Sequence, residues 1–319
     1  MPHADAAPHT SQAIQVVGAL DESTLAAVQS LIKVAEEHDG AGAIGEHKFL
    51  RLGNGGAAAT SALLAYADGA LAGYGHAQAF PISATQRRLA LEMVVHPAFR
   101  RRGIGSGLVR ASLELARAEH ADRLDAWAYN GMSGTRELAR RFAFTQQRLL
   151  LEIRLADLPS APVPALPAGL EPRAFRPGED DAAWLALNNL AFAWHPEQGH
   201  WDAQDVALRL REPWFRAGDF LLVTRGTELV AFNWLKLDET NANGEVYVIG
   251  VHPSLQGQRV GQILTSLGFQ HMRARGMTHA SAYVDATNSA ALRMYYRLGF
   301  VIHHADVCWA RTVVEASPA

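Results

Sequence analysis

An internal repeat is the sequence feature that most constrains the fold of this chain. Residues 94–105 align with residues 250–261, with His96 placed on His252, an offset of 156 residues. The same offset carries residues 142–144 onto 298–300 without a gap. Because the offset is close to half of the 319-residue chain, the repeat indicates a duplicated domain and not a solenoid of short units. The sequence therefore predicts two tandem domains of similar fold.

A proline-rich segment predicts where the two domains meet. Four prolines, at positions 159, 162, 164 and 167, stand among small residues, which is typical of a stiff, extended linker. We therefore expect an N-terminal domain over residues 1–157, a linker over 158–165 and a C-terminal domain over 166–319.

Hydrophobic periodicity predicts the same order of elements in each half. An amphipathic helix is followed by apolar strands, a central strand, a glycine-containing loop, a second helix, another strand, a short helix and a last strand. The expected first helices, central strands and second helices are residues 25–37, 89–95 and 105–119, and residues 180–192, 245–251 and 261–275. This order predicts an α/β fold with a mixed sheet and a central βαβ unit in each domain.

Composition narrows the functional classes. The net charge of −3 argues against a strongly basic nucleic-acid-binding protein, and the single cysteine, Cys308, excludes an intrachain disulfide framework and a cysteine-rich metal site. We find no apolar run of membrane-spanning length, and residues 1–11 lack the pattern of a signal peptide. We therefore expect a cytoplasmic protein without a metal, nucleic-acid or membrane partner. A monomer is expected because the repeat can supply the domain pairing of a dimer.

A short glycine loop lies between the central strand and the second helix of each half. In the first half it reads Arg100-x-x-Gly103-x-Gly105, and in the second it runs from Gln256 to Gly261. The first amides of a helix lack intrahelical acceptors, and glycines let a diphosphate approach the backbone closely. The pattern therefore indicates an anion site, although a tight turn with exposed arginines is the alternative for either loop alone.

These loops resemble the Gln/Arg-x-x-Gly-x-Gly/Ala motif of the GCN5-related N-acetyltransferase superfamily, and Asn288-x-x-Ala291-x-x-x-Tyr295-Tyr296 resembles its second signature. The resemblance implies acetyl-CoA as co-substrate, with its pyrophosphate on the loop amides and its acyl arm between two splayed parallel strands. In the first half it implies contacts from Met93, Val94, Val95, Arg100, Arg101, Arg102, Gly103, Ile104 and Gly105. In the second half it implies contacts from Ile249, Gly250, Val251, Gln256, Gly257, Gln258, Arg259, Val260, Gly261, Gln262, Asn288, Ser289, Ala290, Ala291, Leu292 and Arg293.

The two halves differ in the residues that could move protons. Under the 156-residue offset, Glu245 falls on Leu89 and Tyr295 falls on Ala139. Acyl transfer to an amine needs a base for the ammonium and benefits from an acid for the departing thiolate, and a glutamate and a tyrosine can fill these roles. We therefore expect Glu245 and Tyr295 to be catalytic, with direct transfer in a ternary complex, and the first domain to bind CoA without catalysis.

The second half also carries a polar and aromatic string over residues 188–201 and the segment 232–236. Together they resemble tandem-domain members of the superfamily that acetylate the cysteinyl amine of cysteinyl-glucosaminyl-inositol, a thiol-sugar. The resemblance implies substrate contacts from Glu46 of the first half and from Glu197, Lys236, Glu245 and Tyr283 of the second. Each of the charged residues in this set, taken alone, is more often ordinary surface charge.

The sequence departs from the superfamily pattern at two positions, and two other functions are compatible with it. Arg259 stands where the superfamily has its first loop glycine, which leaves the CoA affinity of the second half undetermined, and Asn233 stands where a residue such as histidine is expected. The alternatives are a tandem acetyltransferase for another small amine and a CoA-binding sensor without catalysis.

Overall fold

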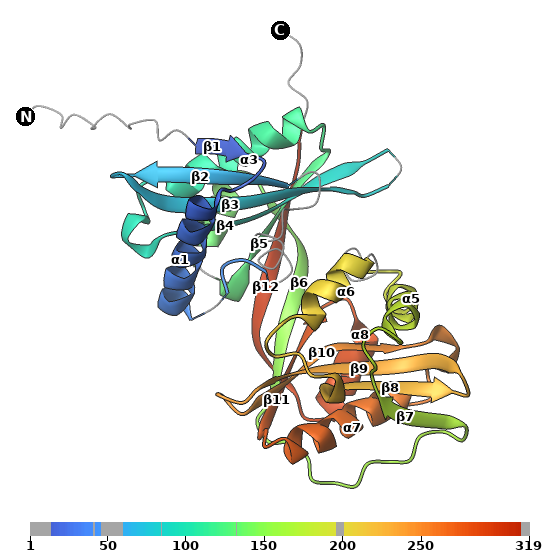
Figure 1. Cartoon of the computed structure of the whole chain (residues 1–319). Helices are drawn as coiled ribbons and strands as arrows, with labels where there is room; N and C mark the ends of the chain where they lie inside the picture. The colour runs from blue at the N-terminus through green and yellow to red at the C-terminus, as the bar shows by residue number, and fades with distance from the viewer. Residues whose placement is uncertain are drawn as a thin grey trace, which may run out of the picture. The chain divides into compact units, whose positions relative to one another are not determined.

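The computed structural model describes residues 14–40, 42–45, 60–83, 85–131, 133–195 and 201–313. These residues form two compact units (Figure 1). The first contains the described residues up to Leu149 together with those from Ala305 onward, and the second contains Leu150–His304.

The first unit is a sheet covered on both faces by helices. Its sheet runs in the order β1-β2-β3-β4-β5-β12, where β12 is Val301–Thr312, and only β4 and β5 are parallel. Its elements are β1 (Ile14–Val17), α1 (Glu22–Asp39), β2 (Thr60–Ala67), β3 (Ala70–Pro81), β4 (Arg87–Val95), η1 (Pro97–Phe99), α3 (Ile104–Ala118), β5 (Arg123–Ala128), η2 (Tyr129–Gly131), α4 (Ser133–Arg141) and the start of β6 (Thr145–Leu155).

Helices α1 and α3 cover opposite faces of this sheet, each with the apolar side of its amphipathic pattern. The apolar residues of α1 recur at helical spacing and pack with Tyr74 and Val94 on one face. The buried residues of α3 pack with Leu89 and Leu91 on the opposite face. Neighbouring positions of β4 therefore face different helices, which decides where a side chain of this strand can act.

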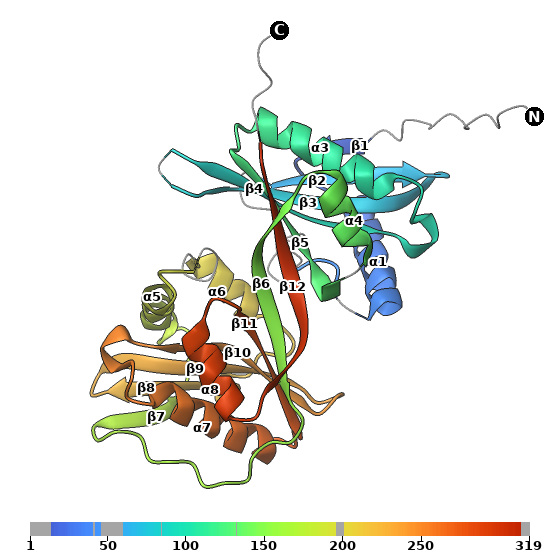
Figure 2. The ribbon, with the colours of Figure 1, turned by 180° about the vertical axis from the view of Figure 1, so that it is seen from behind.

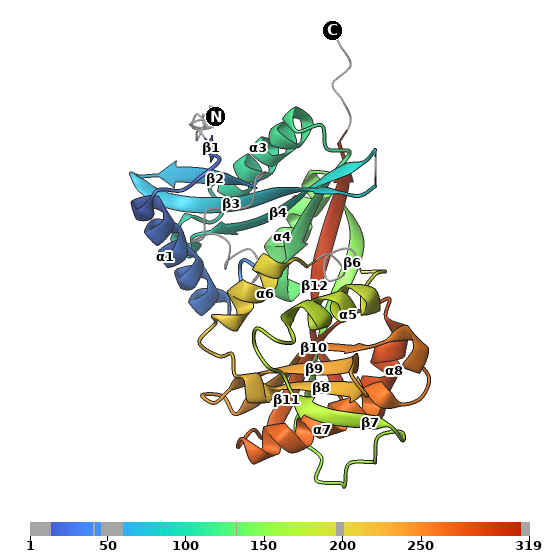
Figure 3. The same ribbon diagram turned by 45° about the vertical axis from the view of Figure 1, so that its right-hand side comes forward.

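The second unit repeats this plan. Its sheet runs in the order β6-β11-β10-β9-β8-β7, and only β10 and β11 are parallel. The elements are β7 (Leu170–Ala174), α5 (Asp181–Ala191), α6 (Ala203–Leu210), η4 (Ala217–Asp219), β8 (Phe220–Arg225), β9 (Glu228–Asp238), β10 (Asn243–Val251), η5 (Pro253–Leu255), α7 (Val260–Ala274), β11 (His279–Asp285), α8 (Ser289–Arg297) and the start of β12 (Val301–Thr312). Helices α5 and α6 lie on one face of β8–β10 and α7 lies on the other (Figure 3).

The last strand of each repeat contributes to the sheet of the other unit. Strand β6 begins in the first unit, but its residues Leu150–Leu155 pair with β11 in the second. Strand β12 begins in the second unit, and its residues Val307–Thr312 pair with β5 in the first. Figure 2 shows both long strands running from one unit into the other. The compact units therefore depart from the predicted halves, 1–157 and 166–319, by an exchange of last strands.

Candidate functional site

The central parallel strands separate in both units. Strands β4 and β5 pair only over Arg88–Leu91 and Arg123–Ala126, although β4 continues to Val95. Strands β10 and β11 pair only over Asn243–Val246 and His279–Ala282, although β10 continues to Val251. In each unit the two parallel strands are therefore unpaired at their carboxyl ends, next to the helix that follows the glycine loop, and we call this unpaired region the slot.

The two glycine loops share one backbone conformation. In the first loop Arg101 and Gly103 have φ angles of 64° and 88°, and in the second Gly257 and Arg259 have φ angles of 79° and 62°. The left-handed positions therefore coincide under the repeat, with arginine and glycine exchanged between them. Arg259 keeps the loop shape that precedes α7, at a conformational cost of about 1 kcal/mol. The departure from the sequence motif does not remove the exposed amides at the start of this helix.

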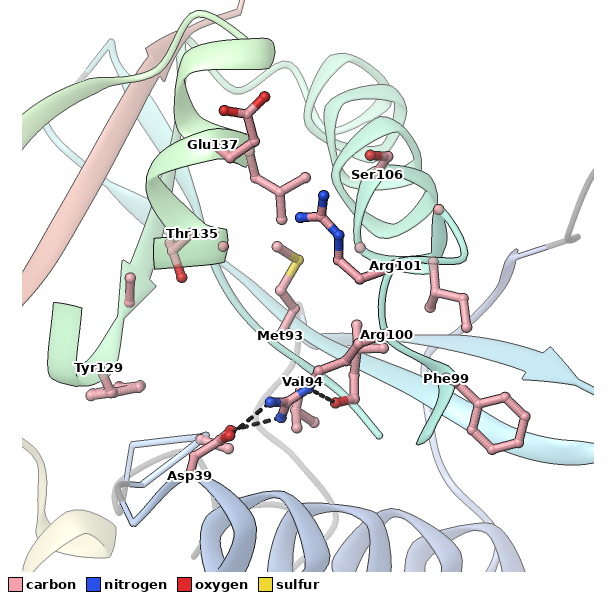
Figure 4. Close-up of a pocket in the computed structure, with 18 of the residues that line it drawn as sticks. Asp39, Met93, Val94, Phe99, Arg100, Arg101, Ser106, Tyr129, Thr135 and Glu137 are labelled. Atoms are coloured by element: carbon pink, nitrogen blue, oxygen red, sulfur yellow. Dashed lines mark hydrogen bonds and ion pairs between the residues drawn. The ribbon is translucent and has the colours of Figure 1, made fainter. Parts of the chain in front are cut away.

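A cavity of about 420 Å³ lies beside the loop of the first unit. Figure 4 shows it between β4, the start of α3, α4 and the end of α1. It brings together most of the predicted CoA contacts of this half, namely Met93, Val94, Val95, Arg100, Arg101, Gly103, Ile104 and Gly105. Arg102 does not line it, because its guanidinium pairs with Asp68 at 2.9 Å. The sequence reasoning missed further lining residues, which lie past the paired part of β5 and on α4: Trp127, Ala128, Tyr129, Thr135, Leu138 and Arg141.

Arg100 contributes to this cavity through its contacts with protein groups. Its two terminal nitrogens each donate to a carboxylate oxygen of Asp39 at 2.7 Å, and its Nε donates to the carbonyl of Val95 at 3.1 Å (Figure 4). The side chain therefore ties the loop to the end of α1 and to β4. Arg101 and Arg141 also line the cavity, next to the start of α3, where helix amides lack intrahelical acceptors.

In the second unit, three elements that carry predicted CoA contacts lie next to one another. A Cβ built on Gly261 would lie 3.7 Å from both Val251 and Met294, so the end of β10, the start of α7 and helix α8 adjoin. Asn288 caps α8, since its Oδ1 accepts a hydrogen bond from the amide of Ala291 at 3.1 Å.

Glu245 and Lys236 lie directly opposite each other on β10 and β9. The Lys236 ammonium is 5.0 Å from the ring of Trp214 and 5.7 Å from that of Tyr247. Arg209 of α6 donates from Nε to the Tyr247 hydroxyl at 2.8 Å. These side chains form a charged and aromatic wall on the α5/α6 face, and the sequence reasoning had identified only Glu245 and Lys236 of it.

A β-bulge explains why Glu245 has no counterpart in the first half. The β10–β9 register shifts between Val246 and Val248, whereas the β4–β3 register is continuous from Arg87 to Val95. A bulge adds one residue and reverses the faces of the residues before it. Glu245 therefore shares a face with Lys236, while Leu89 faces α3 and is buried in the core of the first unit.

The two predicted tyrosines occupy different environments. Tyr283 is 45 % exposed and is the first residue of β11 beyond the part that pairs with β10, so it lies at the slot. Tyr295 of α8 is buried, its ring lies 5.0 Å from that of Phe300, and burial raises the pKa of its hydroxyl well above the ordinary value of 10.0. Tyr295 is therefore protonated at neutral pH, as a general acid must be. Glu46 and Glu197 lie outside the described residues.

Asn233 is fully buried in the second unit, and its side-chain amide donates to the Leu264 carbonyl at 3.1 Å. It packs between β9 and α7, where a Cβ on Gly268 would come within 2.6 Å of its Nδ2. The Asn233 side chain is therefore part of the core on the α7 face. It is not part of the charged and aromatic wall on the α5/α6 face.

Comparison with known proteins agrees with this geometry. The model of the acetyltransferase (GNAT) family matches residues 26–144 and again 184–300. A mycothiol acetyltransferase of Streptomyces avermitilis is 42% identical over 305 residues, which cover 95% of this chain and 96% of that protein. A mycothiol acetyltransferase of Geodermatophilus obscurus is 41% identical over 307 residues, which cover 93% of this chain and 97% of that protein.

Two solved structures share the fold. A tandem GNAT protein from the clavulanic acid biosynthesis pathway has a TM-score of 0.70 at 18% identity, covering 96% of this chain and 100% of that one. A GCN5-related N-acetyltransferase from Sphaerobacter thermophilus has a TM-score of 0.65 at 21% identity, covering 96% of this chain and 98% of that one. At these identities the likeness concerns the fold alone.

These findings confirm the predicted tandem α/β fold, the predicted enzyme class and acetyl-CoA as its co-substrate. Within the described part of the chain, no helix combines the length and apolar character needed to cross a bilayer. The repeated family match and the full-length relatives together place the chain: it belongs to the GNAT acetyltransferases and, among them, to the mycothiol acetyltransferases.

Proposed function

We propose that this protein transfers the acetyl group of acetyl-CoA to the cysteinyl amine of cysteinyl-glucosaminyl-inositol, giving mycothiol and CoA. The observation that carries the proposal is the pairing of Glu245 with Lys236 on the α5/α6 face, next to the slot between β10 and β11. A carboxylate at this position supports the approach of an amine to an acyl group held in the slot. The names of the full-length relatives support the choice of substrate.

In this proposal Glu245 removes the proton that the substrate ammonium must lose before its nitrogen attacks the thioester carbonyl. Amides of β10 around Ile249 to Val251 polarise that carbonyl, and Tyr295 donates a proton to the departing thiolate. The C–N bond forms as the C–S bond breaks, without an acyl-enzyme. Glu245 and Tyr295 each contribute about 10²–10⁴-fold when they act as base and acid.

Lys236 and Tyr283 have the role of holding the polar substrate. Lys236 carries its charge over two aromatic rings and Tyr283 is exposed at the slot, so both present polar atoms to sugar or inositol hydroxyls. Glu46 and Glu197 keep their predicted role as further contacts. A monomer that acts in the cytoplasm also remains part of the proposal, and light scattering tests the oligomeric state.

The cavity of the first unit has the features of a CoA site. Its strand segment, glycine loop and helix start are those that the repeat places in the second unit, and its volume of about 420 Å³ accommodates the extended arm of a coenzyme. We include a CoA molecule bound in this cavity in the proposal.

The test is CoA release from acetyl-CoA by the purified chain, with cysteinyl-glucosaminyl-inositol and with a panel of simple amines. We expect the fastest release with the thiol-sugar and an acetyl group on its cysteinyl nitrogen. Equal or faster CoA release with another amine would identify that amine as the substrate instead. Binding of acetyl-CoA without CoA release for any amine would favour a CoA-binding sensor.

A further inference from the structure

The side of the sheet that carries Glu245 continues beyond β10 onto β11 and β6. Glu245 lies opposite Lys236 of β9 and, on its other side, opposite Ser281 of β11. Ser281 in turn lies opposite Arg154 of β6. Residues that lie directly opposite each other in a sheet point to the same face, so these four residues form one row on the α5/α6 face. Arg154 therefore faces the same side of the sheet as the proposed base, two strands away.

A second row runs beside the first one. Tyr283 of β11 lies opposite Glu152 of β6, and each stands two positions along its strand from the first row. Successive residues of a strand point to opposite faces, so Tyr283 and Glu152 also lie on the α5/α6 face. The residues between the rows, Ala282 and Ile153, lie opposite each other on the other face and are buried. The register therefore places Glu152 and Arg154 next to Tyr283, the predicted substrate contact.

Glu152 holds Arg154 in position. The Nε of Arg154 donates a hydrogen bond to one carboxylate oxygen of Glu152, and the other oxygen lies 3.0 Å from Nδ1 of His304 of β12. The carboxylate is buried between these partners, with 6 % of the Glu152 side chain exposed, whereas half of the Arg154 side chain is exposed. The guanidinium group is therefore fixed at its Nε, while the side chain as a whole is half-exposed.

The terminal nitrogens of Arg154 can bind a ligand. Among the residues that the structure describes, none accepts a hydrogen bond from either of them. A guanidinium group is planar and presents its donors in a fixed fork, so two neighbouring hydroxyl oxygens of one ring can accept from it together. The charge of Arg154 is already paired with that of Glu152, which favours a neutral ligand over an anion. A neutral ring with several hydroxyls is therefore a suitable ligand for this group.

The direction in which an acceptor can extend from Glu245 leads toward Arg154. On the β9 side, strand β8 begins opposite Trp234, so the row stops at Lys236, whose ammonium lies over two aromatic rings. On the β11 side, Tyr283 is exposed. Neighbouring strands are about 4.8 Å apart, so the backbone of Arg154 lies about 10 Å from that of Glu245. An acceptor with two linked rings can span this distance.

We propose that Arg154 binds hydroxyls of the inositol ring of the acceptor, with Glu152 as its positioning residue. This inference rests on the proposed function, in which the cysteinyl amine lies at Glu245. The glucosaminyl ring then lies near Tyr283, and the inositol ring, which is the far end of the acceptor, reaches Arg154. Strand β6, which begins in the first unit, thus supplies the inositol site of the second.

The experiment compares two acceptors, cysteinyl-glucosaminyl-inositol and cysteinyl-glucosamine, which lacks the inositol, with the full-length chain. Arg154→Gln should lower kcat/KM for the complete acceptor by about 10- to 100-fold, mainly through KM, because hydrogen bonds from a charged group are lost. With cysteinyl-glucosamine, Arg154→Gln should equal the wild type. Arg225→Gln is the matched control with no effect on either acceptor, since Arg225 is also half-exposed in the second unit and donates to a glutamate, Glu228.

A second variant tests the positioning role of Glu152. Glu152→Gln should raise KM for the complete acceptor alone. When it is added to Arg154→Gln it should cause no further loss, because the two residues act as one unit.

Thermal unfolding and acetyl-CoA binding are measured on every variant. Arg154→Lys, which keeps the charge and loses the planar fork, serves if Arg154→Gln does not fold, and a loss confined to the complete acceptor is again expected. Three results would overturn the inositol assignment and leave the proposed function intact: unchanged kinetics of folded Arg154→Gln with the complete acceptor, an equal loss with both acceptors, or equal kcat/KM of the wild type for the two acceptors. No acetylation of either acceptor by the wild type would instead overturn the proposed function, and this inference with it.

Discussion

At the scale of single residues, the two loops show that the residues of a motif can change while its backbone conformation is kept. Gly103 and Arg259 occupy the same left-handed position, and so do Arg101 and Gly257. Glycine adopts this conformation at no steric cost, whereas another residue pays about 1 kcal/mol. The sequence showed the departure at Arg259 but could not show that the backbone conformation survives it, because φ is a property of the folded loop.

Replacing Arg259 by glycine should therefore stabilise the protein by about 0.5–1 kcal/mol without loss of acetyl-CoA binding in the second unit. Chemical denaturation gives the free energy of unfolding, and Arg101→Gly, at the other arginine with positive φ, is the matched variant with a similar gain. A clear loss of stability in Arg259→Gly, with Arg101→Gly stabilised, would show that the Arg259 side chain makes a contribution larger than the backbone strain.

The buried tyrosines predict how stability depends on alkaline pH. The pKa values of Tyr295 and Tyr74 are raised, chiefly by burial, above the ordinary value of 10.0. A group whose folded pKa is raised contributes stability that is present below its unfolded pKa and is lost as the pH rises above it. The free energy of unfolding should therefore fall from about pH 10 upward, and less steeply in Tyr74→Phe. Denaturant titrations at pH 8 to 11 measure this, and equal slopes in the wild type and in Tyr74→Phe would contradict it.

At the scale of the elements, the bulge in β10 is the feature that could not be predicted from the sequence. The repeat correctly aligned the central strands and the loops, and the apolar patterns gave the helices that cover each face. Yet Glu245 and Leu89 differ because β10 is irregular against β9 and β4 is regular against β3. Register depends on cross-strand pairing, so a comparison of the two halves residue by residue shows that Glu245 and Leu89 differ but does not show the cause. Helix α6 and its Arg209, which complete the wall, were missed because the contact of Arg209 with Tyr247 joins residues far apart in the chain.

The link between β7 and α5 gives a second pH prediction. Asp180 precedes α5, and Arg173 of β7 donates to both of its carboxylate oxygens at 2.6 and 2.7 Å. These hydrogen bonds, outweighing desolvation, lower the pKa of Asp180 to about 2. Stability from a lowered pKa is present above the unfolded value, 3.8, and is lost as the pH falls toward the folded value. Asp180→Asn should therefore cost about 1–2 kcal/mol at neutral pH and much less near pH 2. Urea unfolding at both pH values checks this, and a cost that does not change with pH would contradict it.

At the scale of the whole molecule, the exchange of last strands decides what can fold alone. The proline-rich segment marks the junction of the sequence repeats, but β12 completes the sheet of the first unit beside β5. A strand edge left unpaired is prone to aggregation. The two halves of the sequence and the two compact units therefore contain different last strands. This difference arises because strands far apart in the chain pair with each other.

We expect that residues 1–157 and residues 166–319, expressed as separate chains, do not fold separately, because each lacks a strand that the other supplies. Circular dichroism and limited proteolysis of each fragment test this, with the full chain as the control. Two well-folded, protease-resistant fragments would show that each repeat can take back its own last strand.

The most direct test of the account is steady-state acetylation of cysteinyl-glucosaminyl-inositol by the full-length chain and by Glu245→Gln. The account predicts rapid, acetyl-CoA-dependent formation of mycothiol by the wild type. For Glu245→Gln it predicts a fall of about 10²–10⁴-fold in kcat while acetyl-CoA still binds. Undiminished acetylation by Glu245→Gln would contradict the assignment of the catalytic base, and no acetylation of the thiol-sugar by the wild type would contradict the proposed reaction itself.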